Sequence, residues 1–234
     1  MARDGGAETL DLTVMIPSRN EAGNIAHAVG DARRVCDDLG LAYEVLVVDG
    51  RSEDGTADLA GQAGARVLTQ SRSGYGVATR EGFEAARGAW ILTMDADLSH
   101  PPEFIAAMWR AREGQALVIA SRYVSGGRAR MSLFRRALSE VLNRFFRAAL
   151  GVKVRDLSSG FRLYRREALR SIPIEGDDFA VLQNILARLH RRGLGIVEVP
   201  FDYRPRASGS SKARLFRFGK SYLRTLLQVR RLRE

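Results

Sequence analysis

The segment Trp90-Ile91-Leu92-Thr93-Met94-Asp95-Ala96-Asp97 decides how the chain is expected to fold. Its first five residues are mostly apolar, which is typical of a strand buried in the centre of a sheet. Two carboxylates follow where this strand ends. The next residues, Ser99-His100-Pro101-Pro102, place a capping side chain before prolines, a pattern typical of the first turn of a helix. A strand, an acidic turn and a helix are therefore expected in succession.

The same rhythm extends over the first 120 residues. Further apolar runs predict buried strands at Leu12–Ile16, Val45–Val48, Val67–Leu68 and Ala116–Ala120. The patterns between the strands predict helices at about 21–39, 56–63, 76–87 and 101–113. This alternation predicts an α/β fold, with a mostly parallel sheet and helices on both of its faces.

The remaining sequence is less regular. It predicts, in order, a helix at about 133–149, a strand Phe161–Tyr164, a short helix Arg165–Arg170, an amphipathic helix Asp178–Arg192 closed by Gly193, and an extended segment Gly195–Tyr203. A loop is expected at Arg204–Lys212 and a basic amphipathic helix at Leu215–Arg233. We therefore expect a catalytic domain over residues 1–212 and a separate C-terminal helix over 213–234.

The net charge of +10 is concentrated at the C-terminal end. Residues 204–234 carry ten lysines and arginines and a single acid, Glu234. Such a segment favours an anionic partner, which is a membrane surface, a phosphate ligand or nucleic acid; a solubilising helix is the alternative. Nucleic acid is disfavoured, because the basic residues lie in a helical pattern rather than among aromatic residues on a sheet.

Cellular location is constrained by three absences from the sequence. Cys36 has no second cysteine to pair with, which fits a reducing compartment. Residues 1–10 lack the apolar core of a secretory signal, and no run of about 18 uncharged apolar residues predicts a transmembrane helix. We expect a cytoplasmic protein in peripheral contact with the cytoplasmic face of a membrane or with a separate membrane subunit.

The chemistry is expected in the segments after the strands, because ligands of such sheets bind beyond the carboxyl ends of the strands. These segments are Pro17–Glu21, Asp49–Thr56, Asp95–His100 and Ser121–Gly127. In extended backbone Asp95 and Asp97 would point to the same side. Two carboxylates so close favour a hard divalent cation such as Mg²⁺ or Mn²⁺. The alternative is an acidic loop that caps the next helix.

Other polar positions have structural as well as functional interpretations. We interpret Asp49 as a ligand-binding carboxylate and Asp54-Gly55-Thr56 as a turn and helix cap. Gly74-Tyr75-Gly76 opens a helix, where glycines allow a phosphate or sugar to approach or simply form a turn. The three histidines do not cluster, so a zinc site is not expected.

Several ordered motifs together resemble the inverting family 2 glycosyltransferases, which have the GT-A fold. The motifs are Ile16-Pro17-Ser18-Arg19-Asn20-Glu21, Val48-Asp49, Asp54-Gly55-Thr56, Gly74-Tyr75-Gly76-Val77-Ala78 and Asp95-Ala96-Asp97-Leu98-Ser99-His100-Pro101-Pro102-Glu103. Later motifs resemble the polyprenol or dolichol phosphate mannosyltransferase subgroup: Ser121-Arg122-Tyr123, Gly126-Gly127, Arg135-Arg136, Ser139, Asn143, Ser158-Ser159-Gly160-Phe161-Arg162, Arg206, Gly209, Ser211 and Lys212. The resemblance covers about residues 12–215.

The resemblance implies roles for individual residues. Pro17, Arg19, Glu21, Asp49, Gly76 and Lys212 would bind the nucleotide sugar, and Asp95, Asp97 and Ser99 the metal. Arg122, Arg135 and Ser139 would bind the acceptor phosphate, and Arg206 would act in catalysis with Asp95 and Asp97. Three positions depart from the family pattern: Gly50 stands for a second acid, Ser18-Arg19 for an aromatic residue, and Ser99 for a polar amide.

The implied reaction is the metal-dependent transfer of a hexose, with inversion, from a nucleotide sugar to a polyprenyl phosphate. Mannose from GDP-mannose is the donor that the subgroup implies; UDP-glucose or another donor remains an alternative. With a hydroxyl acceptor, Asp177 or Asp178 would be the candidate base, although both also read as a helix cap and a first-turn acid. A transferase-like binding subunit without activity is the non-enzymatic alternative.

Overall fold

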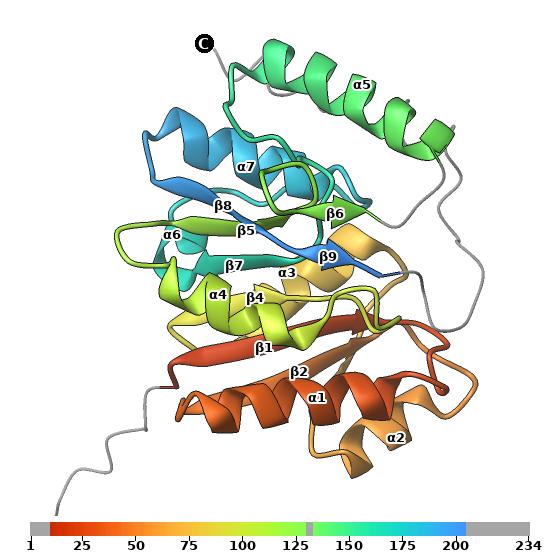
Figure 1. Cartoon of the computed structure of the whole chain (residues 1–234). Helices are drawn as coiled ribbons and strands as arrows, with labels where there is room; N and C mark the ends of the chain where they lie inside the picture. The colour runs from red at the N-terminus through yellow and green to blue at the C-terminus, as the bar shows by residue number, and fades with distance from the viewer. Residues whose placement is uncertain (1–9, 130–132, 205–234) are drawn as a thin grey trace, which may run out of the picture.

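The computed structural model describes residues 10–129 and 133–204, and its centre is a sheet of seven strands (Figure 1). Their order across the sheet is β3-β2-β1-β4-β7-β5-β8. The bounds are β1 Leu12–Ser18, β2 Tyr43–Asp49, β3 Arg66–Thr69, β4 Trp90–Thr93, β5 Leu117–Ser121, β7 Arg162–Arg165 and β8 Ile196–Pro200. Two short strands, β6 Arg128–Ala129 and β9 Asp202–Tyr203, pair separately. The five strands expected in the first 120 residues are all confirmed.

Helices cover both faces of this sheet. They are α1 Ile25–Asp38, α2 Thr56–Gln62, α3 Tyr75–Ala85, the short 3₁₀ turn η1 Pro102–Phe104 followed by α4 Ile105–Arg110, α5 Leu133–Leu150, α6 Arg166–Arg170 and α7 Val181–Arg191. Alternate residues of β1 serve two apolar clusters: Val14 packs with α1, α2 and α4, and Met15 with α3, α6 and α7. This burial on both faces explains why the central strands read as continuous apolar runs.

One strand runs against the others. β7 pairs antiparallel with β4 on one side and with β5 on the other, whereas the β1–β2, β1–β4, β2–β3 and β5–β8 pairs are parallel. The prediction of a mostly parallel sheet is therefore confirmed. The amino-terminal end of β7 lies at the same edge as the carboxyl ends of β4 and β5, so residues just before β7 face the expected site.

Some element boundaries differ from those expected. α1 begins at Ile25 rather than near residue 21, because the chain forms a turn over residues 22–24. The helix expected at 101–113 is shorter and starts with one turn of 3₁₀ helix. α7 begins at Val181 rather than Asp178, and ends before Gly193, whose φ of +68° suits a glycine stop.

Other expectations concern single residues and the chain ends. Cys36 is free and buried, and burial raises the pKa of its thiol to about 12, as expected of an inert packing residue. His27 and His190 are exposed. Within residues 10–129 and 133–204, no helix combines the length and apolarity needed to cross a bilayer. The predicted C-terminal helix at 213–234 lies outside the described residues.

Candidate active site

The acidic motif lies in a turn directly after β4. The extended backbone expected through the motif is not observed, because β4 ends at Thr93 and residues 96–97 form a turn. Asp97 is buried, and its Oδ1 accepts a hydrogen bond from the backbone N–H of Ser99 at 3.0 Å. The side chain of Asp95 is 33% exposed. A tight turn, rather than the pleat of a strand, therefore orients the two carboxylates.

His100 supports Asp95 from behind. Its Nδ1 accepts a hydrogen bond from the backbone N–H of Asp95 at 3.0 Å, and its Nε2 lies 3.8 Å from Oδ2 of the same residue. The ring is buried and stacks on Phe161, with centroids 5.1 Å apart. Burial lowers the pKa of His100, although the carboxylates of Asp95 and Asp97 oppose this shift. A neutral imidazole protonated at Nε2 therefore directs its N–H toward Asp95.

The oxygen atoms of this turn suit a hard divalent cation. Asp95 and Asp97 provide carboxylates, and the buried Oγ of Ser99 has no hydrogen-bond partner among the described residues. Within the same residues no cluster of three or more His, Cys, Asp and Glu side chains could hold a metal. Mg²⁺ is commonly bound by one or two carboxylates together with substrate phosphates and water, so the donor set fits a metal that arrives with a diphosphate.

The ends of β1 and β2 bring the first two polar segments together, because Ser18 is in register with Asp49. Asp49 is buried, and its two carboxylate oxygens accept hydrogen bonds from the backbone N–H and the hydroxyl of Ser52, at 2.9 and 2.6 Å. The structure thus gives Asp49 a turn-holding role, and its contact with a nucleotide stays a prediction. Arg19 is exposed, and its Nη1 donates to Oγ of Ser73 at 2.9 Å.

The next residues of this region form interlocked turns. The backbone N–H of Glu21 donates to Oγ1 of Thr56 at 2.8 Å, and a carboxylate oxygen of Glu21 accepts from Asn24 at 2.9 Å. Oδ1 of Asp54 accepts from the backbone N–H of Thr56 at 3.1 Å, which confirms the predicted turn. Pro17 is half-buried at the end of β1. These contacts are structural; the predicted nucleotide contacts of Pro17, Arg19 and Glu21 are not tested by them.

Gly50, one of the departures from the family pattern, lies in a crowded position. A Cβ atom there would lie 2.8 Å from Oε1 of Gln70 and 3.2 Å from the carbonyl oxygen of Ser18. Gln70 is buried and donates from its Nε2 to the carbonyl oxygen of Gly74 at 2.9 Å. An acid at position 50 would therefore have to displace the side chain of Gln70.

The glycines that open α3 pack against the chain itself. The backbone N–H of Gly76 donates to the carbonyl oxygen of Asp177 at 3.0 Å, and a Cβ at Gly76 would lie 2.2 Å from the carbonyl oxygen of Gly176. Close approach at Gly76 is thus explained by the segment before α7. Its predicted contact with the nucleotide sugar stays a prediction, and would have to use groups other than this N–H.

The segment before α7 is latched onto α3 by charges and an aromatic stack. The carboxylate of Asp177 pairs with Arg72 and with Arg80, with shortest N–O distances of 2.8 and 2.7 Å. Hydrogen bonds from these two arginines lower the pKa of Asp177 to about 2. Phe179 stacks on Tyr75 with ring centroids 4.0 Å apart. We call these four side chains with Asp177 the 177 latch.

Arg122, predicted to bind an acceptor phosphate, is already paired. Its Nε and Nη2 donate to the two carboxylate oxygens of Asp156 at 2.8 and 2.7 Å, and Nη2 also donates to Oγ of Ser158 at 2.7 Å. Asp156 is fully buried. Burial opposes ionisation, but pairing with Arg122 outweighs it and lowers the pKa of Asp156. The pair joins the loop after β5 to the segment before β7.

The segment of residues 156–162, before and into β7, connects Arg122 with the acidic turn. Gly160 lies beside the acidic turn, since a Cβ there would be 3.2 Å from the hydroxyl of Tyr75 and 3.7 Å from Oδ1 of Asp95. The buried guanidinium of Arg162 donates to the carbonyl oxygens of Ser159, Leu157 and Leu182 at 2.7–2.8 Å. Residues 156–162 thus span from Arg122 to Asp95.

Four predicted site residues are not located by these contacts. Arg135 and Ser139 belong to α5, but their side chains lie outside the part of the structure that is described. Arg206 and Lys212 lie outside the described residues altogether. Sequence reasoning also missed Asp156, Phe179, and three arginines of α5 and the turn after it: Arg144, Arg147 and Arg155. Arg144 and Arg147 are three apart in a predicted helix, so their shared face was detectable.

Comparison with known proteins finds relatives that are named as glycosyltransferases or sugar-phosphate synthases. The model of glycosyl transferase family 2 matches residues 13–172. A polyprenol monophosphomannose synthase of Mycolicibacterium smegmatis is 36% identical over 214 residues, which cover 85% of this chain and 79% of that protein. Glycosyltransferase AglJ of Haloferax volcanii is 34% identical over 201 residues, covering 85% of this chain and 65% of that protein. The chain thus spans about two thirds of the length of that relative.

A solved structure supports the same relationship. The crystal structure of glucosyl-3-phosphoglycerate synthase from Mycobacterium tuberculosis, in complex with Mn²⁺, UDP and phosphoglyceric acid, has a TM-score of 0.75 and 26% identity. The match covers 94% of this chain and 78% of that chain. The GT-A-like architecture expected from the sequence is therefore confirmed.

Proposed function

Because the chain belongs to glycosyl transferase family 2, we propose that it transfers a hexose, with inversion, from a nucleotide sugar to a polyprenyl phosphate. Mannose from GDP-mannose is the donor we favour, since the Mycolicibacterium relative is named for phosphomannose synthesis. Mg²⁺ or Mn²⁺ is the proposed cofactor, and a structural neighbour was solved with Mn²⁺ and UDP. The partners are a nucleotide sugar and a lipid phosphate, without nucleic acid.

The reaction would take place at the acidic turn. When bound at Asp95, Asp97 and Ser99, a divalent cation would neutralise the charge that develops on the leaving diphosphate. The N–H of Ser99 holds the carboxylate of Asp97 in place, and the backbone N–H of Asp95 donates to Nδ1 of His100, which fixes the start of the turn. An acceptor phosphate oxygen forms the new bond to the anomeric carbon while the bond to the diphosphate oxygen breaks. Attack from the opposite side inverts that carbon.

The ion pairs and the lowered pKa of Asp177 are the observation that favours a phosphate acceptor over a hydroxyl acceptor. A hydroxyl acceptor needs a base, but Asp177 is held by two arginines and its pKa is lowered to about 2, so it is a weak base at neutral pH. Asp178 is bound to the start of α7, where its Oδ1 accepts from the backbone N–H of Ala180 at 2.9 Å. A phosphate monoester, whose second pKa is about 6, needs no base because it is already ionised.

The remaining binding groups are proposals carried by the family resemblance. Pro17, Arg19, Glu21, Asp49, Gly76 and Lys212 would surround the nucleotide sugar, Arg206 would act on the donor phosphates, and Arg122, Arg135 and Ser139 would receive the acceptor phosphate. The basic residues of 204–234 would hold the chain at the cytoplasmic face of an anionic membrane, either directly or through a membrane subunit.

A donor screen tests the proposal. Purified protein is incubated with Mg²⁺ or Mn²⁺, a short polyprenyl phosphate, and in turn GDP-mannose, UDP-glucose and other nucleotide sugars. We expect formation of a polyprenyl phosphohexose, fastest with GDP-mannose, and loss of turnover when the cation is chelated. No sugar transfer from any donor to any acceptor would refute the proposal in favour of a binding subunit.

A second candidate is glucosyl transfer from UDP-glucose. The structural neighbour with 26% identity contains UDP and phosphoglyceric acid, which is a small phosphorylated molecule. The same screen decides between these functions when phosphoglycerate is added as an acceptor. Turnover with UDP-glucose and phosphoglycerate, and none with the lipid phosphate, would select this second candidate.

A further inference from the structure

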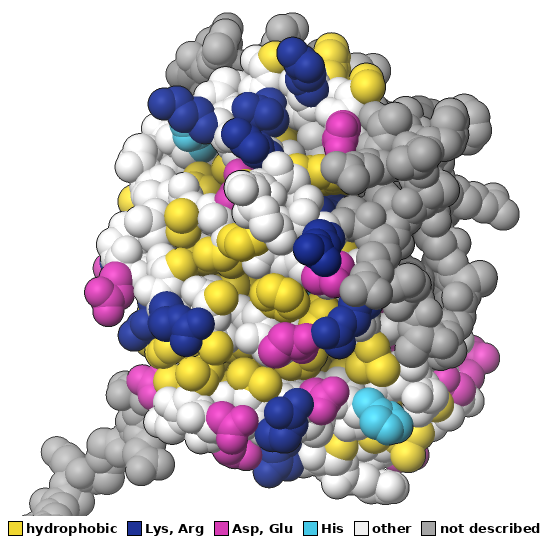
Figure 2. Space-filling model, in the orientation of Figure 1, with side chains coloured by type: hydrophobic (Ala, Val, Ile, Leu, Met, Phe, Trp, Pro, Cys, Tyr) yellow, Lys and Arg dark blue, Asp and Glu magenta, His cyan; other side chains and the backbone are white. Residues whose placement is uncertain are grey.

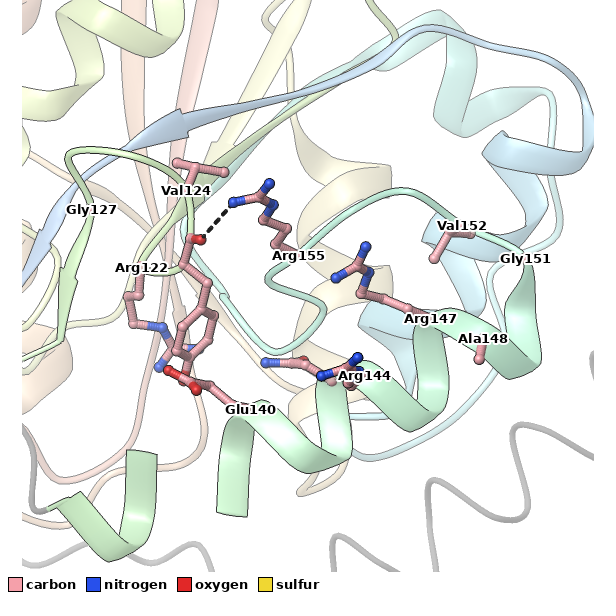
Figure 3. Close-up of a pocket in the computed structure, with 12 residues that line it drawn as sticks. Arg122, Val124, Gly127, Glu140, Arg144, Arg147, Ala148, Gly151, Val152 and Arg155 are labelled. Atoms are coloured by element: carbon pink, nitrogen blue, oxygen red, sulfur yellow. Dashed lines mark hydrogen bonds between the residues drawn. The ribbon is translucent and has the colours of Figure 1, made fainter. Parts of the chain in front are cut away.

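A pocket of about 780 Å³ lies between α5, the turn after it and the loop after β5 (Figure 3). Among the residues that the structure describes, its walls include four arginines and one acid: Arg122, Arg144, Arg147, Arg155 and Glu140. Figure 3 shows the side chains of Arg147 and Arg155 directed into the space between the helix and the loop. Pockets for small organic ligands measure about 300–1,000 Å³, so this one suits a lipid headgroup better than a single ion.

The positive charge of this pocket is only partly compensated. Arg122 is paired with the buried carboxylate of Asp156. Within the described part of the chain, no carboxylate lies at ion-pair distance from Arg144, Arg147 or Arg155. Counted over the described residues alone, the four arginines set against Asp156 and Glu140 leave a formal surplus of two positive charges.

Two of these arginines have donors available for a ligand. Nε of Arg147 is buried and has no hydrogen-bond partner among the described residues. Arg155 is exposed, and its Nη1 makes one long contact, 3.5 Å, to the carbonyl oxygen of Tyr123. Guanidinium groups present planar sets of N–H donors that match the oxygens of phosphoryl groups. The chemistry of the pocket therefore fits a phosphoryl oxyanion.

The same helix presents apolar side chains beside the arginines. α5 packs on the protein through the buried residues Asn143 and Phe146, whereas Val141 and Phe145 are 65% and 56% exposed. Val141 and Phe145 are four residues apart and share one face of the helix. Figure 2 shows apolar side chains beside a basic side chain over α5, at the top of the view. Exposed apolar groups rimmed by arginines suit a membrane interface, and a free phosphate would give them no contact.

We propose that the pocket binds the phosphoryl headgroup of an anionic membrane phospholipid, through Arg144, Arg147 and Arg155, while Val141 and Phe145 enter the apolar layer of the membrane. Arg122 lines the same pocket but is not one of the proposed ligands, because its charge is already balanced by Asp156. This lipid site goes beyond the proposed function, since it does not depend on the donor, the acceptor or turnover. It also assigns membrane contact to α5, in addition to the contact proposed for the C-terminal segment.

Vesicle binding of the full chain tests this site. The variant Arg144→Gln/Arg155→Gln changes two exposed side chains of the pocket, and the control Arg87→Gln/Arg170→Gln removes the same charge from exposed arginines elsewhere. Both retain the C-terminal segment, so its contribution cancels. Co-sedimentation is measured with phosphatidylcholine vesicles with and without phosphatidylglycerol. We expect the pocket variant to lower binding to the phosphatidylglycerol vesicles about tenfold, and the control to lower it less than threefold. Circular dichroism verifies that each variant is folded.

Two results would overturn the proposal. Equal losses in the two variants would show that total charge alone determines binding. Normal vesicle binding, together with a raised KM for polyprenyl phosphate in the pocket variant, would instead assign these arginines to the acceptor. Phe145→Ser provides a second measurement, because it retains every charge; we expect it to weaken binding to phosphatidylglycerol vesicles severalfold. Failure of sugar transfer in all proteins would refute the proposed function and leave the vesicle result standing.

Discussion

The two halves of the sheet hold their parts of the site by different means. In the parallel half, which is β3-β2-β1-β4, the turns after the strands are joined by hydrogen bonds between side chains and backbone, such as Thr56 with Glu21 and Ser52 with Asn20, at 2.8 Å each. In the mixed half, β7-β5-β8, the corresponding loops are joined by the buried pair of Arg122 and Asp156. Local turns thus support one half, and a long-range charge pair supports the other.

This difference teaches which changes should affect activity and which should affect stability. A single hydrogen bond in a turn contributes little to folding, whereas a buried ion pair that loses one partner leaves a charge without compensation. We therefore expect substitutions of the acidic turn in the parallel half to act mainly on turnover. Substitutions of the buried pair in the mixed half should act mainly on the free energy of unfolding.

The largest effect is expected at the acidic turn. Asp97→Asn keeps the shape of the side chain but removes the charge proposed to hold the cation. Metal stabilisation of a leaving diphosphate amounts to several kcal/mol, so kcat should fall about 10³-fold. The value of kcat is measured from steady-state sugar transfer with saturating Mn²⁺. The control Asp38→Asn, an exposed acid at the end of α1, should be unchanged. Equal activity of both variants would remove Asp97 from the reaction.

The next effect tests the buried pair. Asp156→Asn leaves the guanidinium of Arg122 without its carboxylate, which should lower the free energy of unfolding by about 3–5 kcal/mol and Tm by about 10 °C. Thermal unfolding followed by circular dichroism measures this. The double variant Arg122→Met/Asp156→Leu removes both charges and should recover most of the loss. If the single variant is as stable as the parent, the pair does not support the mixed half.

The pair of Arg122 and Asp156 also predicts that the free energy of unfolding depends on pH. The pKa of Asp156 is lower in the folded chain than in the unfolded chain, so its stabilising contribution is present above the unfolded carboxyl pKa of about 4 and is lost as the pH falls below it. The difference in stability between the parent and Asp156→Asn should therefore narrow on acidification. A constant difference down to pH 3 would contradict this assignment.

The two halves also differ in how much the sequence could predict. The turn at Asp54-Gly55-Thr56 was predictable because its hydrogen bonds join residues two apart, and the residue types suit a turn. The strand at Arg162–Arg165 was predicted within one residue, but its antiparallel insertion between β4 and β5 was not. Local patterns carry no information on neighbours that lie between 43 positions (Ile119 and Arg162) and 75 positions (Trp90 and Arg165) away in the chain.

The site shows the same division. Asp95, Asp97 and Asp49 were selected because carboxylates at strand ends are detectable from local order. Asp156 was not, since its partner Arg122 lies 34 residues away and its surroundings read as a loop. The hydrogen bonds of Asp49 to Ser52 could not be predicted from the sequence either. They add a structural role for Asp49 to the predicted ligand role, which stays a prediction.

A smaller effect is expected from restoring the family acid. In Gly50→Asp the new side chain must displace Oε1 of Gln70, and this crowding should lower the free energy of unfolding by about 1–3 kcal/mol. Chemical denaturation measures the change. Gly50→Asp/Gln70→Ala makes room for the carboxylate and should recover part of it. Full stability of Gly50→Asp alone would refute the crowding against Gln70.

The smallest effect on stability is expected at the 177 latch, which joins the two halves. The carboxylate of Asp177 is 54% exposed, so Asp177→Asn should cost no more than about 1 kcal/mol. The pKa of about 2 means that even this contribution, present above about pH 4, is lost as the pH falls toward 2. The effect on transfer should stay below tenfold, as a raised KM for the donor, because only the position of Phe179 on Tyr75 changes.

The latch and a catalytic base make opposite predictions for this residue. Loss of a base reduces kcat by about 10²–10⁴-fold. If Arg72 and Asp177 are only latch partners, substitution of either one should change kcat by a similar, small amount. Steady-state kinetics of Asp177→Asn, Arg72→Gln and the double variant measure the difference. The double variant should be no worse than either single one, because both substitutions break the same contact. A large kcat loss confined to Asp177→Asn would assign Asp177 as the base, and the acceptor would then be a hydroxyl.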